Sequence, residues 1–69
     1  MIALQINGRR VELHQTMPLL EYLQQLDVDA RAVAVEHNGE IIERASYASV
    51  VLRDGDQVEI VRMVGGGLQ

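Results

Sequence analysis

The C-terminal stretch from Asp54 to Gly67 constrains the fold more than any other part of this 69-residue chain. It opens with Asp54-Gly55-Asp56, in which the glycine permits a positive φ and the carboxylates can accept hydrogen bonds from nearby backbone N–H groups. The run from Val58 to Val64 is rich in β-branched residues and predicts a strand. Its side chains alternate between two faces, with Val58 and Ile60 on one and Glu59 and Val61 on the other.

Three glycines follow this strand, at Gly65, Gly66 and Gly67, and none has a side chain that could pack against a core. Because glycine loses the most conformational entropy on ordering, we expect residues 1–64 to form one domain and residues 65–69 a flexible tail. Three extended residues reach about 10–11 Å. A tail of this kind can enter a narrow channel in another protein.

The other predicted elements follow in order along the chain. Apolar residues alternate on both sides of Asn7-Gly8, which predicts an N-terminal hairpin from Ile2 to Leu13. A helix is predicted next, from its leucines at helical spacing, with Thr16 as its N-cap, Pro18 in its first turn and an end near Asp27. The stripe consists of Leu19, Leu20, Leu23 and Leu26.

Two further strands and a connecting loop complete the pattern. A buried strand at Val33–Glu36 turns at Asn38-Gly39 into a short partner at Ile41-Ile42, and Arg44–Ala48 is expected to form one helical turn. The order strand, strand, helix, strand, short strand, strand predicts an α+β fold with a sheet packed on one helix.

Composition excludes several classes of function. The absence of cysteine rules out disulfides and thiolate metal sites. A net charge of -4 argues against nucleic-acid binding. No apolar run approaches the roughly 20 residues of a membrane span, and the start lacks the pattern of a secretory signal, so we expect a cytoplasmic protein.

Few side chains are candidates for catalysis or metal binding. His14 and His37 lack metal-ligand spacing and are interpreted as solvated polar residues. Asp54 and Asp56 are interpreted as turn residues, because general acid–base catalysis would need a cleft. We therefore predict no catalytic residue, no metal site and no cofactor.

Taken together, several short motifs resemble the ThiS-type sulfur carriers of thiamin (thiazole) biosynthesis, a ubiquitin-like β-grasp family. The matching pieces are Ile2 to Gly8, Leu19-Leu20-x-x-Leu23, Val33-Ala34-Val35 with Asn38, Ile41-Ile42-x-Arg44, Tyr47-Ala48, Asp54-Gly55-Asp56 and the glycine tail. The resemblance implies a mixed sheet of four to five strands on one helix, with the first and last strands paired in parallel. It also implies that Tyr47 packs its loop onto the core.

The resemblance further implies a carrier that is not itself an enzyme. An E1-like enzyme would use ATP to adenylate the carboxyl of Gly67, the second residue of the Gly66-Gly67 pair. A sulfur donor such as a cysteine desulfurase would convert it to a thiocarboxylate, and thiazole synthase would receive the sulfur. Leu68 and Gln69 extend beyond the pair, so we expect a protease to trim them.

The same resemblance implies a docking face on the side of the sheet away from the helix. That face would present Ala3, Gln5, Val61 and Met63, with the partner contact continuing through Val64 and Gly65. Two alternatives remain open: the small subunit of molybdopterin synthase, and a ubiquitin-like binding module whose tail is inactive.

Overall fold

A computed structural model describes residues 1–63, and in it the N-terminal hairpin begins a five-stranded sheet. Strands β1 (Ile2–Ile6) and β2 (Arg9–Leu13) pair antiparallel. Asn7 has a φ of 54° and Gly8 a φ of 79°. Positive φ at both central residues is what a tight type I′ turn requires. The predicted hairpin is therefore confirmed.

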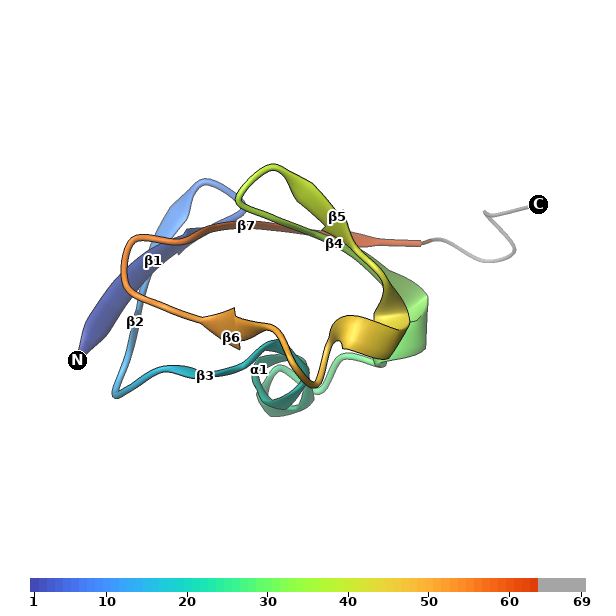
Figure 1. Ribbon diagram of the computed structural model, residues 1–69, viewed down its shortest axis with the longest axis horizontal. Helices are drawn as coiled ribbons and strands as arrows, with labels where there is room; N and C mark the ends of the chain where they lie inside the picture. Colours follow the sequence, from blue (N-terminus) through green and yellow to red (C-terminus); the bar gives the residue numbers. More distant parts are fainter. Residues whose placement is uncertain (64–69) are drawn as a thin grey trace.

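The sheet is mixed and has the order β2-β1-β7-β4-β5, with β7 in the centre (Figure 1). Strand β7 (Gln57–Arg62) runs parallel to β1 and antiparallel to β4 (Val33–His37). Strand β5 (Glu40–Ile42) pairs with β4 at the edge. The expected mixed sheet, with its parallel pairing of the first and last strands, is confirmed.

The start of helix α1 (Leu19–Gln25) differs from the prediction. Thr16 does not cap it; Pro18 occupies the N-cap position, without a side-chain hydrogen bond. The first backbone donors find partners in a neighbouring loop instead, because Leu19 N–H donates to Val50 O at 2.7 Å and Leu20 N–H to Tyr47 O at 3.0 Å. The residues before the helix form strand β3 (Met17–Pro18), which pairs with β6 (Val51–Leu52) in a separate two-stranded sheet.

The helix also ends earlier than predicted, at Gln25 rather than near Asp27. Asp27 takes a φ of 60°, a left-handed conformation that cannot continue the helix. Leu26, just after the end of the helix, is 46% exposed and does not belong to the buried stripe. Tyr22, which the predicted stripe omitted, is buried beside Leu19 and Leu23.

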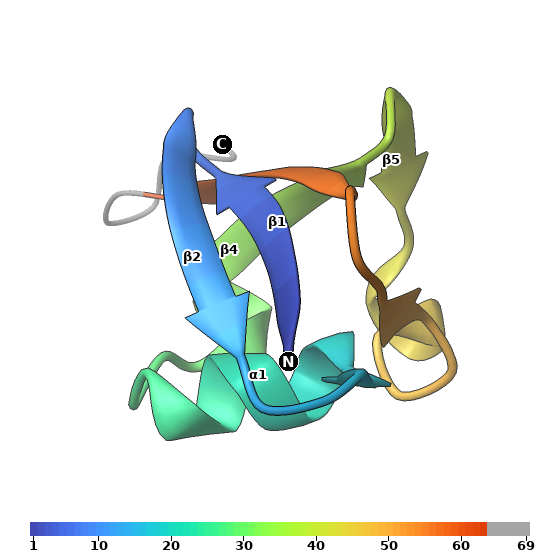
Figure 2. The same ribbon diagram turned by 90° about the vertical axis from the view of Figure 1, so that its left-hand side faces the viewer.

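Helix α1 lies across one face of the sheet (Figure 2), and the core lies between them. It consists of Leu4, Ile6, Leu19, Tyr22, Leu23, Val33, Val35, Tyr47, Leu52 and Val58. Two short 3-10 helices, η1 (Ala30–Ala32) and η2 (Arg44–Ser46), close its side, and η2 is the predicted single helical turn. The expected packing of Tyr47 is confirmed, because its ring is buried and its hydroxyl donates to Val33 O. Among residues 1–63, no helix has the length and apolar character needed to cross a membrane.

Candidate functional site: the open sheet face and the strand that leads to the tail

Strand β7 is held against β4 as far as the last described residue. Arg62 lies opposite Val33, and Met63 N–H donates to Ala32 O at 2.8 Å. The glycine pair Gly66-Gly67 and the adjoining Val64 and Gly65 lie outside the described residues, as do the boundary at residue 64 and the predicted flexibility of residues 65–69. These features remain predictions. The strand that precedes them, β7, is paired with β4 from Val58 to Arg62.

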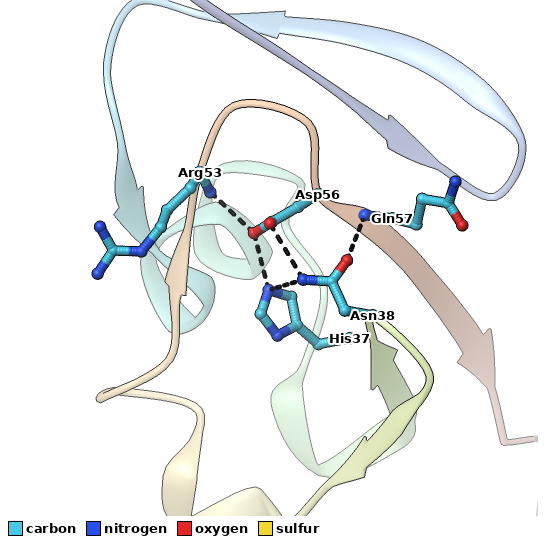
Figure 3. A network of polar contacts seen from close by, with 5 residues as sticks. All are labelled: His37, Asn38, Arg53, Asp56 and Gln57. Carbon is cyan, nitrogen blue, oxygen red and sulfur yellow. Dashed lines mark hydrogen bonds and ion pairs between the residues drawn. The ribbon is translucent and has the colours of Figure 1, made fainter.

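A polar network fixes the beginning of β7 (Figure 3). Asp56 is almost fully buried, with 11% of its side chain exposed. Its Oδ2 accepts from Arg53 N–H at 2.9 Å and lies 2.7 Å from His37 Nε2, while its Oδ1 accepts from Asn38 Nδ2 at 3.1 Å. Asn38 Oδ1 in turn accepts from Gln57 N–H at 2.9 Å. The network therefore connects the β4–β5 turn to the turn that precedes β7.

The charge of Asp56 depends on these contacts. Burial alone would raise the pKa of its carboxyl, but the hydrogen bonds from His37, Arg53 N–H and Asn38, with the charge of His37, outweigh it and hold the pKa below the ordinary value. The interpretation of His37 as a solvated residue is wrong, since only 19% of its side chain is exposed. Sequence spacing could not reveal this pair, because the two residues meet only through the pairing of β4 with β7.

The two turn aspartates confirm the prediction that their carboxylates bind backbone N–H groups. Asp54 Oδ1 accepts from Ala3 N–H at 2.8 Å, a bond to the distant strand β1. Asn7 also binds backbone groups of a distant strand, in this case β7. Its Oδ1 accepts from Ile60 N–H at 2.7 Å and its Nδ2 donates to Ile60 O at 3.2 Å. The sequence marked Asn7 only as a turn residue. Its side chain also extends the pairing of the β1 end with β7.

The face of the sheet opposite α1 has an exposed apolar patch next to the end of β7. Ile41 is 73% exposed and Val61 is 59% exposed. Val61 lies opposite Ala34, and the three residues border a shallow groove of about 270 Å³ that also includes Glu36 and Glu59. The expected division of β7 is confirmed, because Val58 is buried while Glu59 and Val61 are exposed.

The structure separates the predicted docking residues into two groups. Gln5 lies opposite Gln57, and Val61 is four residues further along β7, about 13 Å away at the rise of a strand. Ala3 lies still further from Val61, whereas the half-buried Met63 continues its alternation. The patch near the end of β7 is completed instead by Ala34 and Ile41. The sequence did contain an indication that one residue of the Ile41-Ile42 pair is exposed, because two consecutive isoleucines in a strand cannot both face the core.

The family model named ThiS family matches residues 4–67. The chain belongs to the ThiS family. The match includes Gly66 and Gly67 and stops before Leu68. The resemblance of the short motifs is thereby confirmed at the level of the family, ahead of the molybdopterin synthase alternative.

Relatives and solved structures agree with this membership. The sulfur carrier protein ThiS of Bacillus subtilis is 40% identical over 65 residues, which cover 93% of this chain and 98% of the relative. The crystal structure of the thiamine biosynthesis protein ThiS from Geobacter metallireducens superposes with a TM-score of 0.83 at 35% identity, covering 96% of this chain and all of the other. The β-grasp fold is thus confirmed.

A third relative is much longer than this chain. The thiazole synthase of Paramagnetospirillum magneticum is 47% identical over 62 residues, which are 90% of this chain and 19% of the relative. The chain therefore spans about a fifth of that protein's length. A sequence of this kind occurs there within a polypeptide named for the synthase.

Proposed function

We propose that this chain carries sulfur as a thiocarboxylate on Gly67 for the formation of thiazole in thiamin biosynthesis. The observation that carries the proposal is the family match, which extends through Gly66 and Gly67. Support comes from the paired strand β7, which leads directly to that segment from a body held by Asp56 and Asn7. A rigid body with a side-chain-free end suits delivery of an acyl group into another protein.

The chemistry needs an activated carboxyl. A free C-terminal carboxylate has a pKa of roughly 3.3–3.7, so at neutral pH it is an anion that nucleophiles do not attack readily. An oxygen of the Gly67 carboxylate attacks the α-phosphorus of ATP, and pyrophosphate leaves. Sulfide then attacks the acyl carbon, AMP leaves, and the thiocarboxylate remains.

We assign the catalytic groups for these steps to partner enzymes. The partly buried pair of His37 and Asp56 is engaged in holding the turn before β7. The chain then acts in the cytoplasm as co-substrate of an E1-like adenylating enzyme and of thiazole synthase, and a sulfur donor such as a cysteine desulfurase supplies the sulfur.

Thiazole synthase is the proposed recipient of the sulfur. Support comes from the longer relative that bears this name and contains a similar sequence over 62 residues. The docking residues, which we propose for the adenylating enzyme as well as for the synthase, are Val61 and Met63 on the open face, followed by Val64 and Gly65 toward the tail. Exposure of Val61 beside Ala34 and Ile41 supports this assignment.

Gly67 is followed by Leu68, so its carboxyl lies in a peptide bond. A peptide bond leaves no carboxylate to adenylate. We therefore include a peptidase that cleaves after Gly67 among the partners.

The test uses a chain that ends at Gly67 and, as its control, the chain that ends at Gln69. Each is incubated with ATP, the adenylating enzyme and sulfide, and its intact mass is measured. The chain ending at Gly67 should gain the mass difference between sulfur and oxygen, and the control should not. If neither chain changes although the enzyme adenylates the B. subtilis carrier, the proposal is wrong.

A further inference from the structure

Two glutamates lie side by side on the open face of the sheet. Glu36 of β4 and Glu59 of β7 are directly opposite each other in the antiparallel register, and the next pair on the same face is Ala34 with Val61. Glu36 also lies opposite Ile41 of β5. The two carboxylates therefore stand next to the apolar patch, within the same groove.

Neither glutamate is neutralised within the described part of the chain. The ion pairs among residues 1–63 join Arg10 to Glu12, Arg31 to Asp29 and His37 to Asp56. Like charges directly opposite each other on neighbouring strands are unfavourable, and glutamate is depleted in strands. Two glutamates placed opposite each other on neighbouring strands thus do not stabilise the isolated domain.

We propose that Glu36 and Glu59 together bind an arginine side chain of the adenylating enzyme that docks on this face. A guanidinium has five N–H donors in a planar fork and can donate to two carboxylates at once. Its aliphatic stem packs on apolar surface, which Ala34, Ile41 and Val61 provide beside the pair. Lysine offers a point charge without this planar fork, so the arrangement favours arginine.

This inference rests on the proposed function in one respect, namely that the enzyme that receives the tail also covers the open face. The carboxylate pair would then determine partner choice and the stability of the complex. The glycine tail would supply the reacting group. The two roles can be separated experimentally.

The experiment measures the affinity of the adenylating enzyme by calorimetric titration at low and at high salt. The variants are Glu36→Gln, Glu59→Gln and the double variant, and Glu21→Gln is the control. Glu21 is an exposed residue of α1, on the covered side of the sheet, and its substitution changes the net charge as each single variant does.

Each single variant should bind several-fold more weakly, and the double variant about tenfold or more at low salt, because a charged hydrogen-bonded partner is lost. High salt should narrow the gap between the wild-type chain and the double variant. The control should bind within about twofold of wild type, as exposed charges remote from an interface contribute little. Circular dichroism of the free variants should match that of the wild type.

Unchanged affinity of the double variant, or an equal loss in Glu21→Gln, would overturn the inference. If the wild-type chain ending at Gly67 acquires sulfur while the double variant binds normally, only the carboxylate pair is refuted. If the wild-type chain binds the enzyme through the pair but never acquires sulfur, the proposed function fails instead. Absence of any wild-type binding refutes both.

Discussion

Asp56 shows how one residue can hold together segments that are distant in sequence. Its carboxylate receives hydrogen bonds from Arg53 N–H and Asn38 and lies against His37. Loss of these contacts would remove the acceptor of Arg53 N–H and of Asn38 Nδ2, and the partner of the His37 ring, at the beginning of β7. Because β7 is the central strand, we expect this loss to lower the stability of the whole domain.

The stability of the domain should depend on pH through Asp56. Its pKa is lower in the folded state than in the unfolded chain, so the ionised form stabilises the fold. This stabilisation is fully present above the unfolded pKa of about 3.9, and it is lost as the pH falls through the lower, folded value. Urea unfolding between neutral and acidic pH measures the effect.

The control for that measurement is Asp56→Asn, which keeps the shape of the side chain but cannot ionise. It should be less stable than wild type at pH 7 by about 1–3 kcal/mol, since charged hydrogen bonds are lost. The difference should shrink toward low pH. Parallel pH profiles for the two proteins would show that Asp56 does not make this contribution.

Asn7 combines two demands at the β1–β2 turn. Its backbone has a φ of 54°, and its amide bonds both the N–H and the C=O of Ile60. Asn7→Gly should lose only the amide bonds, at about 1 kcal/mol, whereas Asn7→Ala should also suffer the left-handed strain of roughly another 1 kcal/mol. Thermal unfolding of the three proteins should therefore rank asparagine above glycine above alanine. Equal stability of the glycine and alanine variants would contradict the backbone argument.

At the scale of secondary structure, local chemistry predicted some elements and tertiary contacts decided others. The turn at Asn7-Gly8 and the alternation of β7 are local, and both were predicted. The start of α1 was not predicted correctly, because the backbone N–H groups of Leu19 and Leu20 donate to a loop that comes later in the sequence. The burial of Tyr22, and the end of the helix at Gln25 before the left-handed Asp27, are features that leucine spacing does not reveal.

Met63, which directly follows β7, is predicted to contribute to partner docking. Met63→Glu should weaken docking to the adenylating enzyme, because it adds a charge beside the exposed Val61 and removes apolar surface. The fold should remain intact, since Met63 is only partly buried. Leu26→Glu is the matched control, as Leu26 is 46% exposed on the helix side. Equal affinities for the two variants in a binding titration would show that Met63 does not belong to the docking surface.

For the whole molecule, the order of elements predicted an α+β sheet on one helix, and the family resemblance supplied its parallel central pairing. Register then decided which predicted surface residues lie together. Val61 lies opposite Ala34 and lines the same groove as Ile41, while Ala3 and Gln5 lie toward the far end of the face. The association of His37 with Asp56 likewise needs the β4–β7 register, which no local pattern contains. The glycine pair was recognised from sequence, and the family match includes it.

We expect Gly67 itself to hold the sulfur. The most direct test is fragmentation mass spectrometry of the chain ending at Gly67, after reaction with ATP, the adenylating enzyme and sulfide. The sulfur-for-oxygen mass gain should appear only in fragments that contain the C-terminal glycine. A gain located on any other residue, or no gain with an enzyme that charges the B. subtilis carrier, would contradict it.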